Sequence, residues 1–498
     1  MKRYIKINDR DNVIVALTDL RSNEQIEDIK LREEIKAGHK FSAIAIAKGQ
    51  AVVKYGAKIG YATADIKAGQ WVHTHNIKTS LGEIKEYEYD PEIKDNDRKE
   101  DSEINDNERK KEREFQGYRR PNGKVGIRNE IFIIPTVGCI NNIASEVARG
   151  SQQFLCKNID AIVSYSHPYG CSQMGEDQEN TKKILADLIN HPNAAAVLVI
   201  GLGCENCNIE ELKKYIGEYD KERVKFVVCQ EVEDEIEYSI EQVRGLVEWA
   251  KKFEREACST KDLIIGLKCG GSDGLSGITA NPALGAFSDL LIAKGGTTIL
   301  TEVPEMFGAE TLLMARCENV DVFEKTVKLI NDFKEYFIAH DQVVYENPSP
   351  GNKAGGISTL EDKSLGCTQK SGTSKVVDVL SYGEQVKKRG LNLLSGPGND
   401  LVAATALASS GAQIVLFTTG RGTPFASPVP TIKISSNSML AEKKNKWIDF
   451  DCGKMLKEDV NIAEELMDYV LEVASGKKVK SEILGMRDMA IFKQGVTL

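Results

Sequence analysis

The stretch IFIIPTVGCINN, residues 131–142, is a run of apolar residues that ends in glycine, cysteine and two asparagines. It leads into IASEVARGSQQFL, residues 143–155, in which apolar residues recur at helical spacing. An apolar strand, a glycine-containing loop and an amphipathic helix form the repeating unit of parallel α/β sheets. This stretch therefore predicts an α/β fold.

The same unit recurs along the chain. Further apolar strands with polar or glycine-rich ends are AIVSYSHPYGCSQ (161–173), AAAVLVIGLGCENC (194–207) and VKFVVCQE (224–231). The pattern restarts at about residue 256 and continues through DLIIGLKCGGSDGLSG (262–277), GTTILTEVPEMFG (296–308), LNLLSGPGND (391–400), QIVLFTTGRGTPF (413–425) and TIKISSN (431–437). We therefore predict two α/β domains with largely parallel sheets, at residues 116–255 and 256–498.

The first 115 residues do not follow this strand, loop and helix pattern. Residues 1–90 contain short β-prone stretches separated by glycines and polar turns, which predicts a small β module. Residues 86–115 carry charges of both signs and almost no apolar side chain, so they cannot form a core. We therefore expect a linker at residues 91–115.

The composition bounds the possible functions. The chain has 498 residues, of which 41% are hydrophobic and 28% charged, as in soluble proteins of two to four domains. A net charge of −9 argues against a nucleic-acid partner, and no apolar run is long enough to cross a membrane. Charges interrupt the N-terminal apolar stretches, so we expect no signal peptide, and eleven cysteines then indicate a reducing, cytoplasmic location. The expected partner is a small molecule.

Chemically active residue types gather where the predicted strands end, which is the edge where open α/β sheets bind ligands. In the first α/β domain these residues are Cys139, His167, Cys171, Cys204, Cys207 and Cys229. In the second they are Lys268, Cys269, Asp273, Glu302, Glu305, Asn399, Asp400, Arg421 and Thr423. A purely structural role would not require thiols, carboxylates and cations at one edge. The sequence therefore predicts an active site.

Each of these signals also has a structural explanation. Cys204 and Cys207 form a CxxC motif, but no second CxxC completes a zinc site. His167 precedes a proline, and its ring either fixes that loop or acts in the site. The glycine-rich loops serve tight turns or bind an anion, and Arg421 has the geometry to hold a carboxylate in bidentate fashion.

The segment WVHTHN, residues 71–76, contains two of the six histidines. On a strand, His73 and His75 would project from one face and together bind a metal ion. The alternative is a sheet edge with two exposed imidazoles.

Six blocks together resemble the altronate/galactarate dehydratase family. They are GYRRPNGKVGIRNEIFIIPTVGCINN, HPYGCSQ, GLGCENC, KCGGSDGLSG, SGPGND and FTTGRGTPFASPVPTIKISSN, and they span about residues 116–437. Residues 1–90 are similar to the small β-clip (SAF) module of that family, including its HxHN segment at His73, His75 and Asn76.

The resemblance implies an iron(II)-dependent hydro-lyase that acts on a hexonate or hexarate. The GIRN segment favours D-altronate, which would give 2-dehydro-3-deoxy-D-gluconate. We expect His73 and His75 as metal ligands, with Fe(II) or another divalent ion, and a general base among His167, Lys268 and Glu302. The predicted substrate-binding residues are Arg128, Asn129, Asp273, Asn399, Asp400, Arg421 and Thr423.

Several alternatives stay open at this stage. An iron–sulfur dehydratase would hold its cluster with three of Cys139, Cys171, Cys204, Cys207, Cys269 and Cys367. Other hypotheses are a galactarate or other hexarate or hexonate dehydratase, a sulfolactate sulfo-lyase-like elimination and a non-catalytic sugar-acid sensor. The sequence does not decide the stereoisomer of the substrate, and it leaves open whether the chain forms a homo-oligomer.

Overall fold

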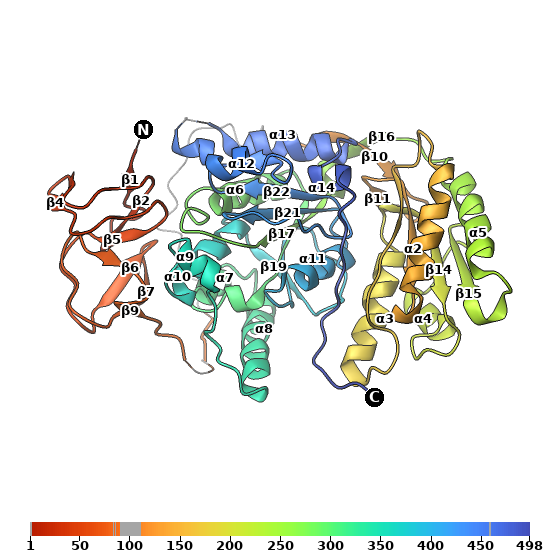
Figure 1. Cartoon of the computed structure of the whole chain (residues 1–498), viewed down its shortest axis with the longest axis horizontal. Coiled ribbons are helices and arrows are strands. Elements are labelled where there is room, and N and C mark those ends of the chain that lie inside the picture. Colours follow the sequence, from red (N-terminus) through yellow and green to blue (C-terminus); the bar gives the residue numbers. More distant parts are fainter. Residues whose placement is uncertain (1, 83, 85, 90–110, 458–459) are drawn as a thin grey trace.

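The computed structural model describes residues 2–82, 84, 86–89, 111–457 and 460–498, and Figure 1 shows three bodies in a row. The N-terminal module lies at one end, the C-terminal α/β domain in the middle, and the first α/β domain, which is the second domain of the chain, at the other end. The predicted linker at 91–115 falls largely outside the described residues. Its last two residues begin strand β10 (Glu114–Arg119), so the linker ends earlier than we predicted.

The N-terminal module consists of short antiparallel strands, as predicted. Its sheets have the orders β1-β2-β5-β8 and β6-β7-β9, with β3-β4 as a hairpin. The strands are β1 (Tyr4–Ile5), β2 (Val13–Ala16), β3 (Gln25–Ile26), β4 (Ile29–Lys30), β5 (Lys40–Ser42), β6 (Ala51–Lys54), β7 (Ala57–Ala62), β8 (Trp71–Val72) and β9 (Ile77–Lys78).

The second domain is a four-stranded parallel sheet of order β13-β12-β14-β15. Its strands are β12 (Glu130–Pro135), β13 (Ala161–Ser164), β14 (Ala194–Gly201) and β15 (Val224–Val228). Its helices are α2 (Asn141–Gly150), α3 (Gly175–Ile189), α4 (Ile209–Ile216) and α5 (Glu235–Ala250). Strand β14 is buried over its whole length because α2 and α5 cover one face and α3 and α4 the other.

The C-terminal domain is built on a seven-stranded parallel sheet of order β19-β20-β18-β17-β21-β22-β23. The strands are β17 (Ile264–Cys269), β18 (Thr297–Leu300), β19 (Val376–Leu380), β20 (Leu391–Leu394), β21 (Ile414–Thr419), β22 (Thr431–Ser435) and β23 (Phe450–Asp451). The helices are α6 (Ala280–Ala293), α7 (Glu310–Met314), α8 (Val320–Ala339), α9 (Pro350–Ala354), α10 (Leu360–Cys367), α11 (Asp400–Ser409), α12 (Ser438–Lys443), α13 (Ile462–Ala474) and α14 (Lys480–Ile483). The predicted α/β class with largely parallel sheets is thus confirmed.

The two α/β domains are joined by a small antiparallel sheet and by a shared apolar core. Strand β10 pairs with β11 (Val125–Gly126) on one side and with β16 (Glu256–Ser259) on the other. Ile184 of the second domain and Leu407 of the C-terminal domain belong to one buried cluster. No helix in the described part of the chain is long and apolar enough to cross a membrane.

Candidate active site

Strand β17 lies at the centre of the C-terminal sheet and ends in Lys268 and Cys269, whose side chains are fully buried. All strands of this sheet are parallel, so the loops after β18, β20 and β21 leave from the same edge. Helix α10 and the short helix η6 (Thr368–Ser371) pack beside this edge. The residues predicted at the ends of β17 and β18 therefore meet side chains from a separate helical segment.

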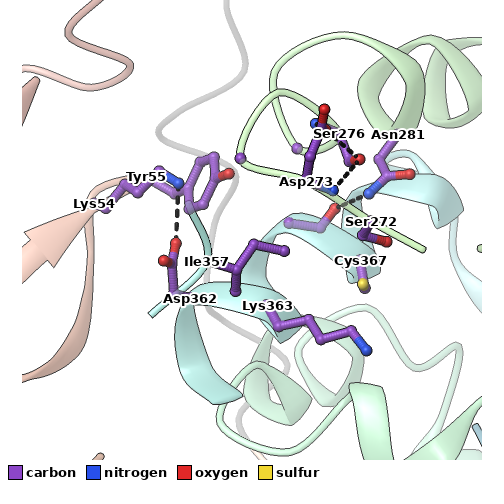
Figure 2. Close-up of a pocket in the computed structure, with 13 residues that line it drawn as sticks. Lys54, Tyr55, Ser272, Asp273, Ser276, Asn281, Ile357, Asp362, Lys363 and Cys367 are labelled. Atoms are coloured by element: carbon purple, nitrogen blue, oxygen red, sulfur yellow. Dashed lines mark hydrogen bonds and ion pairs between the residues drawn. The ribbon is translucent and has the colours of Figure 1, made fainter. Parts of the chain in front are cut away.

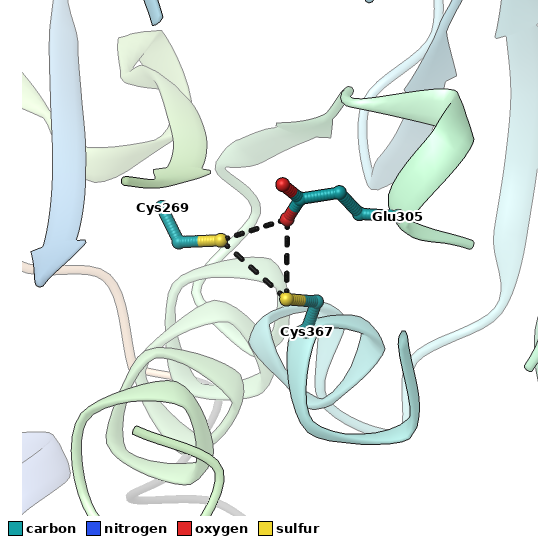
Figure 3. Close-up of side chains that lie close together, drawn as sticks. All are labelled: Cys269, Glu305 and Cys367. Atoms are coloured by element: carbon teal, nitrogen blue, oxygen red, sulfur yellow. Dashed lines mark hydrogen bonds between the residues drawn. The ribbon is translucent and has the colours of Figure 1, made fainter. Parts of the chain in front are cut away.

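A thiol–carboxylate site lies directly at the end of β17 (Figure 3). Glu305 Oε2 is 3.0 Å from Cys269 Sγ and 3.2 Å from Cys367 Sγ, and the two sulfurs are 3.5 Å apart. All three side chains are buried. No other group of three His, Cys, Asp or Glu residues in the described part of the chain brings its ligand atoms within 4.8 Å of one another.

Buried charges surround this thiol–carboxylate site. Lys268 Nζ lies 2.6 Å from Glu302 Oε1 and 2.9 Å from Asp400 Oδ1. Lys370 Nζ lies 3.1 Å from Glu302 Oε2 and 2.9 Å from Cys269 Sγ. Lys363 Nζ is 2.7 Å from a carboxylate oxygen of Glu305. Three lysines thus face three carboxylates, and we call these six residues the charged cluster.

The contacts within the charged cluster keep its lysines and Glu305 ionised. Burial disfavours charge on Lys268, but Glu302 and Asp400 outweigh it and the pKa of Lys268 is raised. Burial likewise raises the pKa of the Glu305 carboxyl, but Lys363 and Lys370 outweigh it and the pKa is lowered to about 2. Lys268 is therefore a protonated donor in this arrangement and not a free base.

The thiol of Cys367, next to the charged cluster, stays uncharged. Its hydrogen bond with Cys269 and its burial raise the pKa of Cys367 well above the ordinary value, so the thiol holds its proton. The three lysines and the three carboxylates of the charged cluster balance in charge. A divalent cation that displaces both thiol protons would leave that balance unchanged. Two thiolates and a carboxylate suit Fe²⁺ or another borderline transition metal, so these residues fit the expected ion.

Glu302 has an unusual backbone conformation in addition to its contacts with two lysines. It has a φ of 70°, in the left-handed region that residues with a side chain seldom adopt. The turn points its carboxylate back at β17, where it accepts a hydrogen bond from the Cys269 N–H at 3.0 Å. Backbone strain of this kind is typical of functional sites.

The N-terminal module closes a narrow pocket beside the thiol–carboxylate site (Figure 2). Lys54 and Tyr55 line it from the module, while Asp362 and Cys367 line it from α10. Asp362 Oδ1 pairs with Lys54 at 2.9 Å and Oδ2 with Lys40 at 2.8 Å, all three side chains being buried. The module is thus anchored on the helix that carries Cys367.

Glycines allow the module to approach this closely. A Cβ on Gly274 would lie 1.8 Å from the carbonyl oxygen of Gly38, so no larger residue fits there. The KCGGSDG loop after β17 therefore contacts the module through its backbone. Gly274, one of the glycines that marked this loop in the sequence, serves this contact.

Four of the predicted substrate-binding residues follow strands β20 and β21 of the C-terminal domain. Arg421 is exposed on the loop after β21, and its backbone N–H donates to Gly271 O at 3.0 Å. Asp400, whose side chain is 32% exposed, also reaches this edge. Asn399 caps α11 by accepting from the N–H groups of residues 401 and 402, and Thr423 Oγ1 accepts from the N–H of residue 425. Arg421 and Asp400 are thus the members best placed to meet a ligand.

The carboxylate of Asp273 holds its own loop. It accepts hydrogen bonds from Ser276, Ser436 and Asn437 at 2.9–3.2 Å. Burial raises the pKa of Asp273. Asp273 lines the pocket, but its carboxylate oxygens are already occupied.

Arg128 and Asn129 lie elsewhere, before the amino end of β12. The Arg128 guanidinium binds Glu482 at 2.7 Å and the carbonyls of Val473 and Lys477. Asn129 donates to the carbonyls of residues 158 and 250. Arg128 ties the second domain to the C-terminal segment, whereas Asn129 ties loops within the second domain to one another. The prediction that they bind substrate is not supported by their position.

The two histidines of WVHTHN do not lie on a strand, so that part of the prediction is wrong. They occupy the turn between β8 and β9, because Asn76 folds the chain back through its bond to the His73 N–H. His73 is buried, and its Nε2 lies 2.9 Å from Lys353 O. His75 is exposed, and both rings lie against Trp71. Burial lowers the pKa of His73 to about 4, so its ring is neutral.

His167 belongs to the second domain and has a loop-fixing role. Its Nε2 donates to Pro135 O at 2.7 Å, and its Nδ1 accepts from the Tyr169 N–H at 3.2 Å. Burial lowers the pKa of His167 to about 4. Both nitrogens are engaged by backbone, which matches the structural alternative for this residue.

The remaining cysteines of the first α/β domain also lie apart from the charged cluster. Cys139, Cys171 and Cys204 are exposed, whereas Cys207 is buried and its pKa is raised by burial to about 12. The CxxC pair therefore has one thiol inside the fold and one outside it.

Sequence reasoning missed two lysines of the charged cluster. Lys363 and Lys370 belong to no strand end, because they stand on α10 and η6. The segment LEDKSLGCTQK places Lys363, Cys367 and Lys370 at spacings of four and three residues, on one helical face. Two lysines on one predicted helical face together with a cysteine were the available signal.

Comparisons with known proteins agree with this arrangement. The D-galactarate/altronate dehydratase C-terminal model matches residues 260–497, the D-galactarate dehydratase/altronate hydrolase second-domain model matches residues 117–251, and the altronate/galactarate dehydratase SAF-domain model matches residues 2–80. Together these models cover the three bodies of the structure.

Known proteins are also similar to this chain over their full length. The chain is 53% identical over 507 residues to altronate dehydratase of Escherichia coli (strain K12) and 52% identical over 510 residues to that of Bacillus subtilis (strain 168), with 100% of each chain covered. Galactarate dehydratase (L-threo-forming) of Escherichia coli (strain K12) is 32% identical over 509 residues, covering 95% of this chain and 93% of the relative. The chain therefore belongs to the altronate/galactarate dehydratase family.

Proposed function

We propose that this chain dehydrates D-altronate to 2-dehydro-3-deoxy-D-gluconate in the cytoplasm, using Fe(II) held by Cys269, Glu305 and Cys367. Its full-length similarity to two altronate dehydratases, well above that to galactarate dehydratase, carries the choice of substrate. The buried thiol–carboxylate site at the end of β17 supports the choice of metal ligands. Eleven free cysteines support a reducing location.

The difficult step is removal of the C2 proton next to an already anionic carboxylate. A divalent ion bound by the thiol–carboxylate site would supply Lewis acidity toward the substrate carboxylate and 2-hydroxyl. The chain itself must supply a base at C2 and an acid for the departing 3-hydroxyl. Both groups are present in the charged cluster.

Glu302 is the proposed base and Lys268 the proposed acid. Of the three sequence candidates, His167 lies in the second domain, apart from the thiol–carboxylate site, and Lys268 is already protonated. Glu302 accepts the C2 proton, the C2–H electron pair forms the C2–C3 double bond, and the C3 hydroxyl leaves as water with a proton from Lys268. Proton transfer across the 2.6 Å Lys268–Glu302 hydrogen bond then restores both groups. The enol product tautomerises to the 2-keto acid.

Arg421 is proposed to hold the substrate carboxylate. We expect Arg421→Ala to raise KM for D-altronate by about 10–100-fold with a smaller effect on kcat, because a charge-assisted hydrogen bond is lost. Steady-state kinetics measure both constants. Arg389→Ala is the matched control, since Arg389 is also exposed but lies before the amino end of β20. Unchanged kcat/KM in Arg421→Ala would remove this residue from the site.

A substrate panel tests the proposed function. Purified protein is loaded anaerobically with Fe²⁺ and incubated with D-altronate, galactarate and other aldonates and aldarates, and 2-keto-3-deoxy acid formation is measured. We expect the highest kcat/KM with D-altronate. Preference for galactarate would overturn the substrate assignment. Thermal stabilisation by a sugar acid without any product would instead support the sensor hypothesis.

A further inference from the structure

Three exposed cysteines mark the carboxyl edge of the sheet in the second domain. Cys171 follows β13, Cys139 follows β12 and Cys204 follows β14, and these three strands are adjacent in the sheet. Free cysteine is normally among the most buried residue types. One exposed thiol on each of three neighbouring loops therefore requires an explanation, and the proposed dehydration uses none of them.

Hydrogen bonds next to each cysteine hold the three loops together. The Gly138 N–H donates to Tyr169 O at 2.9 Å, which joins the loop of Cys139 to that of Cys171. The Cys207 N–H donates to Gly170 O at 2.9 Å, and the Ser172 N–H donates to Asn206 Oδ1 at 3.0 Å. These bonds join the loop of Cys171 to that of Cys204.

The loop of Cys171 is also built tightly. A Cβ on Gly170 would lie 1.9 Å from Thr136 O, and Ser172 has a φ of 58°. His167 fixes the start of this loop through both of its ring nitrogens. Gln230 Nε2 donates to Cys204 Sγ at 3.6 Å, so one sulfur already has a hydrogen-bond donor beside it. The fold thus presents the three thiols from a rigid frame.

The three exposed sulfurs do not form a ready-made site for a single ion. In the described part of the chain only the thiol–carboxylate site has three ligand atoms within 4.8 Å of one another, so at least one pair of the three exposed sulfurs is farther apart than that. Sulfurs that bind different irons of one cluster are farther apart than sulfurs that share one ion. Thiolates on loops are the usual ligands of iron–sulfur clusters.

We infer that Cys139, Cys171 and Cys204 bind a [4Fe–4S] cluster, one thiolate to each of three irons, with the fourth iron facing solvent. Each thiol loses its proton as its sulfur binds iron. When equal amounts of ferrous and ferric iron are supplied with sulfide, the cluster assembles without any oxidation or reduction by the protein. This site is separate from the thiol–carboxylate site, which lies in the C-terminal domain beside the N-terminal module (Figure 1).

Anaerobic reconstitution of the full chain tests this inference. The protein is incubated with equal ferrous and ferric iron and with sulfide, freed of excess reagents, and assayed for iron, acid-labile sulfide and visible absorbance. We expect about four sulfides per chain, the content of one [4Fe–4S] cluster. Acid-labile sulfide is the decisive readout, because Fe²⁺ in the thiol–carboxylate site brings none.

Matched variants locate the cluster. The triple variant Cys139→Ala, Cys171→Ala, Cys204→Ala should lose the sulfide and the visible band, with its circular dichroism unchanged. Cys156→Ala should keep both, since Cys156 is an exposed cysteine of the same domain before the amino end of β13. Equal sulfide in the wild type and the triple variant would overturn the inference. Loss of sulfide in Cys367→Ala alone would move the cluster to the other site and also overturn it.

Discussion

Turnover of D-altronate is expected to fall by about 10³-fold or more in Cys367→Ala, because the Lewis acid that we propose it helps to hold would contribute several kcal/mol. Iron content after anaerobic loading with Fe²⁺ should fall with it. The thiol of Cys367 must lose its proton to bind, and its pKa is raised, so iron affinity of the wild type should increase with pH. Metal analysis and kcat measured on the same samples check both effects.

Two sets of variants separate metal binding from other effects. Cys452→Ala removes a buried thiol of the same domain next to the edge strand β23, and it should keep its iron and its turnover. His73→Ala and His75→Ala test the alternative ligand pair. If the histidine variants lose iron while Cys367→Ala keeps it, the metal belongs to the turn between β8 and β9, and our ligand assignment fails.

Glu302→Gln is expected to lower kcat by about 10²–10⁴-fold, since an amide cannot accept the C2 proton. The same change leaves Lys268 and Lys370 without their shared carboxylate, so we also expect a loss of about 3–5 kcal/mol in the free energy of unfolding. Activity must therefore be measured at a temperature where the variant is folded. Steady-state kinetics and urea unfolding give the two quantities.

Glu310→Gln is the matched control for this variant. Glu310 is a buried carboxylate 3.6 Å from the ammonium of Lys334 and 2.6 Å from the Tyr87 hydroxyl, outside the charged cluster. Its loss should reduce stability with kcat largely retained. A Glu302→Gln enzyme with wild-type kcat would exclude Glu302 as the base.

Much of the architecture was predictable because each part has a local signal. Strands such as AAAVLVIG are apolar throughout, as expected when helices cover both faces of a sheet, and β14 is indeed buried along its whole length. The glycine-punctuated residues 1–90 predicted the small β module. The position of the linker was less accurate, because the pairing of β10 with β16 connects segments about 140 residues apart and has no local signature.

The candidate active site was only partly predictable. Open α/β sheets bind ligands at the edge where their strands end. This rule located Lys268, Cys269, Glu302 and Glu305, since it depends only on the positions of strand ends. It also selected His167, whose ring turned out to be occupied by backbone. A position at a strand end predicts that the side chain reaches the edge of the sheet. It does not predict whether that side chain already has hydrogen-bond partners there.

The sequence by itself determined the fold class, the order of the three bodies and the family, because apolar periodicity, glycine-rich turns and motif order are local properties of the chain. Only the tertiary structure decided which chemical groups share a site. Cys269 on β17 and Cys367 on α10 are 98 positions apart, yet their sulfurs lie 3.5 Å from each other. The same packing buries Lys363 and Lys370 against Glu305 and Glu302. The ionisation of those groups depends on burial and on charges brought from distant segments, and neither is encoded in the residues that flank them.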